Sequence, residues 1–209
     1  MQAFLLLLGV FYVLLLSNHL GNVYTLFMRA TSGTATPHRT PDLRGGSNYV
    51  PFLNLAVVVG VLFAGILCMR LAAPIAFAAP VPQLALSLAV SAAFAAILLL
   101  QTGMLRLAGA VTLQQEFIAE LNGVKRTSLA LYSILLPPAL LCYALTPVGS
   151  GATWIYVILA ETAIVLFLFL KESSALFAAK KVSIFHWILY LCIVELFPVS
   201  LLWLLIARR

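Results

Sequence analysis

Two acidic residues stand in the middle of long apolar stretches of this chain of 209 residues. Glu161 is central in residues 152–170, and Glu195 is central in residues 184–206. A carboxyl group at the centre of a bilayer costs about 2.5–3.5 kcal/mol, so such groups normally face inward and are paired or neutral. No Lys or Arg lies in the core of any apolar stretch. We therefore expect at least one of the two carboxyls to be protonated, and their chemistry to be proton or ion binding.

A double proline interrupts a third apolar stretch. Pro137 and Pro138 occupy the middle of residues 128–147. Because proline has no N–H group, the carbonyls of Ser133 and Ile134 lose their helical partners. A freed carbonyl at membrane depth must find another donor. The Ser133 hydroxyl, a protonated glutamic acid or a trapped water would each serve.

Two further residues join this set of polar and helix-breaking positions. Pro198 adds a kink beside Glu195, and Tyr190 lies deep enough that its hydroxyl needs a polar partner. Discontinuous helices with acids at the midplane form ion sites in secondary transporters, whereas two neutral carboxyls beside a kink would form a structural polar core. Both interpretations stay open. The candidate site comprises Ser133, Pro137, Pro138, Glu161, Tyr190, Glu195 and Pro198.

The common catalytic sequence motifs are absent from the chain. There is no GxxxxGK[ST] phosphate loop, no HExxH metal helix and no GxSxG nucleophile elbow. His19, His38 and His186 lie in different segments without ligand spacing, and the three cysteines stand singly in apolar runs. We therefore expect no enzyme activity, no metal site and no cofactor.

The composition is that of a membrane protein. Apolar residues make up 64% of the chain and charged residues 9%, against about 45–50% and 25% in soluble domains. A bilayer core takes about 20 residues per helix. We expect one transmembrane domain over residues 1–209, an all-α bundle of about six spans, or five if the first segment is interfacial. The six apolar segments are 3–28, 52–69, 84–100, 128–147, 152–170 and 184–206.

The segments between the expected spans differ in character. Residues 30–51 form one long polar loop, and residues 107–127 are amphipathic, which predicts a cytoplasmic extension after the third helix. Asn122-Gly123 is typical of a helix end, so the fourth helix is expected to start only near residue 128. Ser87, Ser91 and Ala95 give the third helix a small face suited to close packing.

The basic residues set the expected orientation. The net charge of +6 comes from residues that flank the apolar runs, which is typical of membrane topology and argues against nucleic-acid binding. Nine basic residues fall on one side of a six-span arrangement and three on the other. The loop 30–51 and segments 107–127 and 171–183 are then cytoplasmic, and the C-terminus is periplasmic. Basic residues placed to face anionic lipid are Lys125, Arg126, Lys171, Lys180 and Lys181.

The last apolar segment carries a resemblance to a known family. Residues 185–192 read Phe-His-Trp-Ile-Leu-Tyr-Leu-Cys, and Glu195 and Pro198 follow them in the spacing Tyr-Leu-Cys-x-x-Glu-x-x-Pro. With Lys125 and Pro137, this pattern resembles the integral-membrane domain-of-unknown-function family 4271, most strongly over residues 113–206. Relatives often place Lys after an aromatic near the end, where this chain has Leu204 after Trp203. The resemblance implies an inner-membrane protein of Gram-negative bacteria and no established activity.

Two classes of function fit these residues. The first is a non-catalytic subunit or assembly factor of a membrane complex, with a membrane-protein partner. The second is a small proton- or ion-coupled transporter that uses Glu161 and Glu195, for which a homo-oligomer is the expected assembly. A membrane-embedded enzyme ranks third, because no nucleophile–base pair or metal set is visible.

Overall fold

The computed structural model describes residues 2–32, 49–72, 83–112, 115–146, 152–180 and 184–192. These residues form seven helices and no strand, which confirms the all-α prediction. The helices are α1 (Gln2–Asn18), α2 (Leu20–Ser32), α3 (Tyr49–Ala72), α4 (Gln83–Thr112), α5 (Gln115–Leu145), α6 (Ala152–Ala179) and α7 (Ile184–Tyr190).

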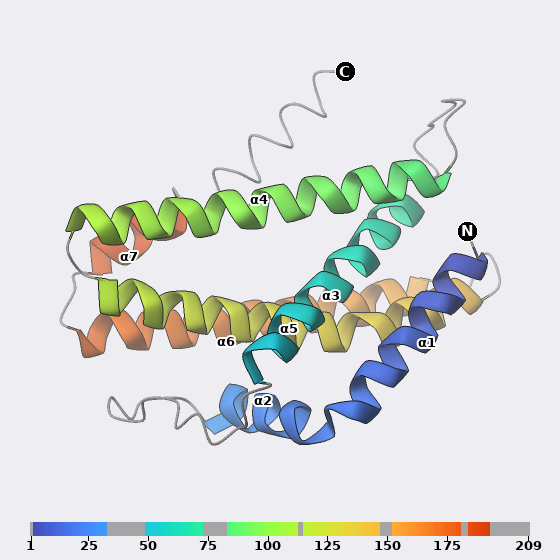
Figure 1. The fold of residues 1–209 in the computed structure, drawn as a ribbon, viewed down its shortest axis with the longest axis horizontal. Helices are drawn as coiled ribbons and strands as arrows, with labels where there is room; N and C mark the ends of the chain where they lie inside the picture. Colours follow the sequence, from blue (N-terminus) through green and yellow to red (C-terminus); the bar gives the residue numbers. More distant parts are fainter. Residues whose placement is uncertain are drawn as a thin grey trace.

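Helix α5 is the centre of the bundle. It packs against α1, α2, α3, α4 and α6. The long helices α4, α5 and α6 run lengthwise, α3 crosses them obliquely, and α1 and α2 lie on one side (Figure 1). The main core is built from apolar side chains of α1, α2, α3, α5 and α6, and among its most deeply buried members are Phe52, Phe63, Leu136 and Leu140.

Four of the described helices are long and apolar enough to cross a bilayer. They are Tyr49–Met69, Gln83–Leu107, Gln115–Leu145 and Thr153–Ala179. The bent pair Phe4–Asn18 and Leu20–Ala30 makes a fifth if it counts as one span. Of the predicted sixth segment only residues 184–192 are described. The chain is therefore a helix bundle with four or five candidate membrane spans within its described part.

The first apolar segment is broken rather than straight. Its two halves, α1 and α2, meet at His19 at an angle of 83°. The backbone N–H of Asn22 donates to the His19 carbonyl at 2.9 Å, and the Asn22 amide lies 3.3 Å from the His19 ring nitrogen Nδ1. The apolar segment expected over residues 3–28 therefore forms two helices, which meet at the polar group Ser17-Asn18-His19. The polar side chains at this turn form hydrogen bonds that stabilise it, which apolar side chains could not do.

The segment predicted as an extension after the third span belongs to two long helices, because α4 continues to Thr112 and α5 begins at Gln115. Helices α4, α5 and α6 have 30, 31 and 28 residues. At 1.5 Å per residue each exceeds a bilayer core of about 30 Å by roughly ten residues. The helix end predicted at Asn122-Gly123 is wrong, because α5 runs unbroken from Gln115. Glycine inside a helix costs only about 1 kcal/mol, which packing at this end outweighs.

The extended ends share a second core of their own. Its buried members are Leu105, Leu121, Phe169, Phe177 and Tyr190, which come from α4, α5, α6 and α7. The ring of Phe177 meets Phe117 edge-on at 4.9 Å. The Trp187 indole N–H donates to the Ser173 hydroxyl at 3.1 Å, which ties α7 to α6.

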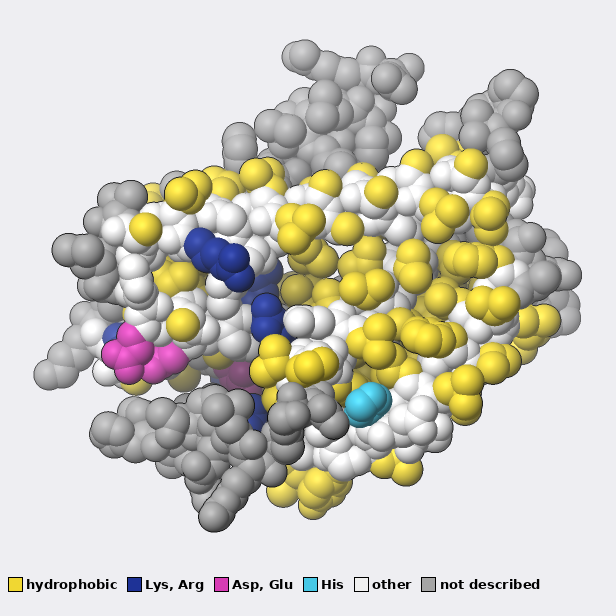
Figure 2. All heavy atoms as spheres, viewed as in Figure 1, with side chains coloured by type: hydrophobic (Ala, Val, Ile, Leu, Met, Phe, Trp, Pro, Cys, Tyr) yellow, Lys and Arg dark blue, Asp and Glu magenta, His cyan; other side chains and the backbone are white. Residues whose placement is uncertain are grey.

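Charge is concentrated at this same end. In α4, α5 and α6 every charged residue except Glu161 lies in the last third of α4, the first half of α5 or the last third of α6. These parts meet because the three helices alternate in direction. Figure 2 shows the basic and acidic side chains on the left of the view, over the ends of α4 and α5, and apolar side chains over most of the rest.

Small residues bring α3 close to its neighbours. A Cβ added at Gly60 would overlap the Ser133 side chain and lie 2.8 Å from its Cα, and one at Gly65 would lie 2.8 Å from the Ser87 carbonyl oxygen and overlap Ser91. Ser87 and Ser91 are buried. The small face predicted for the third helix is therefore a packing surface against α3.

Candidate functional site at mid-membrane

The double proline lies within α5, and one of the two carbonyls that it frees accepts a hydrogen bond from another helix. The Tyr12 hydroxyl of α1 donates to the Ile134 carbonyl at 2.7 Å. That carbonyl is the one which Pro138, four residues later, leaves without a partner. The Ser133 hydroxyl donates to the Leu129 carbonyl at 2.7 Å, so it does not reach the freed group.

Tyr12 is the site residue that the sequence reasoning missed. Its side chain is 5% exposed, and its ring meets Phe63 edge-on at 6.2 Å. The available signal was a phenol in the middle of an apolar segment, since a buried Tyr hydroxyl nearly always has a polar partner. What the sequence did not tell was which helix holds that partner.

Glu161 lies on α6 beside the same region. Its Oε2 atom is buried and has no hydrogen-bond partner within the described residues. Its carboxyl group lies near the hydroxyls of Tyr12 and Tyr132. The Thr162 hydroxyl donates to the Ile158 carbonyl at 2.7 Å, and its oxygen lies 3.4 Å from the Tyr132 hydroxyl. A carboxyl, two phenols and a proline break thus share one region between α1, α5 and α6.

The other predicted members of the site fall elsewhere. Tyr190 is buried in the second core with Phe169 and Phe177, away from Glu161. Glu195 and Pro198 lie outside the described residues. The expectation that Glu161 and Glu195 approach one another therefore stays a prediction.

Lys125 occupies a different position from the one expected. Its side chain is 6% exposed, and its ammonium group donates to the Gln101 side-chain oxygen at 2.7 Å across the α4–α5 interface. Gln101 is buried as well. The prediction that Lys125 faces lipid is wrong, because α5 continues through this position and turns the side chain toward α4. A basic residue does therefore lie inside the bundle.

The remaining basic candidates are nearer the surface. Lys171 is exposed, Arg126 is half-buried, and Lys180 is exposed and pairs with Glu120 at 3.2 Å. Lys181 lies outside the described residues. Within the described part of the chain, no three His, Cys, Asp or Glu side chains are grouped to hold a metal ion, and Cys68, Cys142 and Cys192 are free thiols.

These features define a class of protein: an all-helical membrane bundle with a polar region at mid-span and a charged end. The chain belongs to the family described as a domain of unknown function, DUF4271, whose model matches residues 1–206. The match extends the resemblance seen in the C-terminal half to nearly the whole chain. Comparison with curated proteins and with solved structures gives no match.

Proposed function

We propose that this protein is a non-catalytic subunit or assembly factor that binds another transmembrane segment through the outer face of α6. The observation that carries the proposal is Glu161. Its Oε2 atom is buried within the bundle, but the residue as a whole is only partly buried and Thr162 beside it is exposed. A partner segment with a hydroxyl, amide or basic side chain at the same depth would donate to the exposed part of this carboxyl group.

The surroundings of Glu161 favour a docked helix. Only 17% of the most apolar window of α6 is buried inside the bundle. Ile158 and Val165 face the core, while Leu159, Ile164 and Phe167 are exposed. Glu161 is half-buried at the edge of this exposed face. A carboxyl at the bilayer centre costs about 2.5–3.5 kcal/mol, and polar side chains at this depth commonly hydrogen-bond between helices. Binding a partner there would relieve that cost.

A proton- or ion-coupled transporter is the second candidate, and a specific observation favours it. The first span is bent by 83° between its two helices. Tyr12 in this span donates a hydrogen bond to the carbonyl freed at the proline break, and its hydroxyl lies near Glu161. Broken helices around a midplane acid are the usual construction of ion sites in transporters.

Two substitutions of Glu161 separate the candidates. Glu161→Gln keeps hydrogen bonding and removes titration, whereas Glu161→Leu removes both. If α6 binds a partner, the partner should co-purify in mild detergent with the Gln variant and be lost with the Leu variant. If the carboxyl couples transport, both variants should abolish proton uptake into proteoliposomes that contain a pH-sensitive dye. Proton uptake by the wild type that Glu161→Gln removes would overturn the subunit proposal.

We also propose a bacterial inner-membrane location with the charged end in the cytoplasm. The support is the excess of basic residues on that side of the spans, nine against three.

A further inference from the structure

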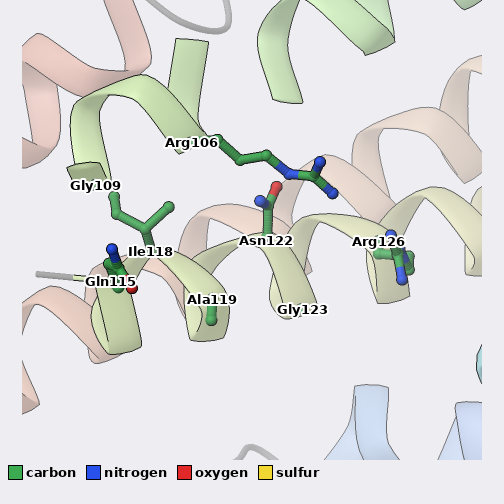
Figure 3. A pocket seen from close by; sticks show the side chains of 8 residues that line it. All are labelled: Arg106, Gly109, Gln115, Ile118, Ala119, Asn122, Gly123 and Arg126. Carbon is green, nitrogen blue, oxygen red and sulfur yellow. The ribbon is translucent and has the colours of Figure 1, made fainter. Parts of the chain in front are cut away.

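We propose that a cavity between the end of α4 and the start of α5 binds the phosphate group of an anionic phospholipid. The cavity has a volume of about 490 Å³ and lies at the charged end of the bundle. Its polar lining includes Arg106 from α4 with Asn122 and Arg126 from α5, and Gly109 and Gly123 form part of its wall. Figure 3 shows the Arg106 side chain extending from α4 across to the amide of Asn122, with Arg126 one turn further along α5.

The chemistry of the lining selects an anion. Two guanidinium groups and the amides of Gln115 and Asn122 are present, and no carboxylate lines the cavity. Arginine presents a planar fork of donors that matches phosphate oxygens in pairs. Of the acids on α5, Glu120 is engaged by Lys180 at 3.2 Å and Glu116 lies outside the lining. The guanidinium groups therefore keep their positive charge available to a ligand.

Two glycines shape the space. A Cβ at Gly109 would come within 3.0 Å of the Ile118 side chain, so glycine there lets the end of α4 approach α5. A Cβ at Gly123 would meet nothing within 4 Å. A larger side chain at Gly123 would therefore enter the cavity without displacing its neighbours.

The position of the cavity favours a lipid over a soluble phosphate ester. Arg106 is the penultimate residue of the apolar span Gln83–Leu107. Leu99 lies two helical turns earlier on the same face of α4 and is 74% exposed. A Cβ added at Gly103, which lies between Leu99 and Arg106, would meet nothing within 4 Å. A phospholipid with its phosphate on Arg106 and Arg126 would lay an acyl chain over Gly103 and Leu99. Basic pockets between transmembrane helices bind anionic headgroups in this way.

The test is lipid binding to the purified full chain in a neutral detergent, followed by native mass spectrometry. Phosphatidylglycerol, phosphatidylcholine and glycerol phosphate are the three probes. Wild type should bind phosphatidylglycerol about tenfold more tightly than phosphatidylcholine, and glycerol phosphate should not compete at equal concentration. Equal competition by glycerol phosphate would overturn the assignment to a lipid.

Three variants locate the binding. Arg106→Gln with Arg126→Gln should reduce phosphatidylglycerol affinity about tenfold. Gly123→Leu should reduce it similarly with no change of charge, because its side chain fills the cavity. Arg29→Gln with Lys171→Gln removes the same charge outside the cavity and should leave affinity unchanged. An equal loss in this control, or full binding by either cavity variant, would contradict the proposal.

Discussion

At the scale of single residues, the proline break depends on one hydroxyl. Tyr12 donates to the Ile134 carbonyl, the group that Pro138 deprives of its helical donor, at 2.7 Å. A buried polar group without a partner costs about 1–3 kcal/mol. The hydrogen bond also joins α1 to α5, through two residues that are 122 positions apart in the chain.

Tyr12→Phe should therefore lower the free energy of unfolding by about 1–3 kcal/mol. Thermal unfolding in detergent, followed by circular dichroism, measures the loss. Tyr24→Phe is the matched control and should change little, because Tyr24 is exposed. In a Pro138→Ala background the Ile134 carbonyl regains an N–H donor, so Tyr12→Phe should cost clearly less there. An undiminished cost in that background would refute this role of Tyr12.

The buried Lys125 also depends on a neighbour. Gln101→Leu removes the acceptor 2.7 Å from its ammonium group, and should destabilise the protein by about 1–3 kcal/mol. Gln83→Leu on the same helix changes an exposed residue and serves as the control in the same unfolding measurement. Equal unfolding temperatures for the two variants would show that this hydrogen bond contributes nothing.

At the scale of helices, close approach between α3 and α5 requires glycine at position 60. Gly60→Ala places a methyl group against Ser133, 2.8 Å from its Cα, and should cost about 1–3 kcal/mol by overpacking. Gly103→Ala, where a Cβ meets nothing within 4 Å, should be neutral or slightly stabilising. Unfolding midpoints of the two variants in parallel would test the contrast, and no difference would contradict the packing described.

Helices were more predictable from the sequence than the contacts between them. Apolar runs located α3 to α6 because a bilayer admits mainly continuous apolar helices. The break at His19 was marked by polar residues, but its angle of 83° depends on packing against α3 and α5. The end predicted at Gly123 failed because tertiary contacts of Leu121 and Phe117 in the second core outweigh a local helix-stop signal. Tyr12 at Ile134 and Lys125 at Gln101 are pairings between helices, which no local pattern encodes.

At the scale of the whole molecule, the expected orientation is open to a direct test. A periplasm-active reporter fused after Gly149, between α5 and α6, should be active. The same reporter fused after Lys180, at the end of α6, should be silent, because the basic end is retained in the cytoplasm. Enzymatic activity of the two fusions in intact cells gives the answer. The reverse pattern would invert the proposed topology and place the cavity of Arg106 and Arg126 in the periplasm.

The central claim is that the outer face of α6 around Glu161 binds another transmembrane segment. Site-specific photocrosslinking in intact membranes tests it most directly, with the crosslinking residue at Ile164, which is exposed on α6. Leu88, exposed on α4, and Val165, buried beside Ile164, are the matched controls. We expect one discrete adduct with a different protein from Ile164 alone, retained with Glu161→Gln and lost with Glu161→Leu. Adducts with lipid only, or with a second copy of this chain, would contradict it.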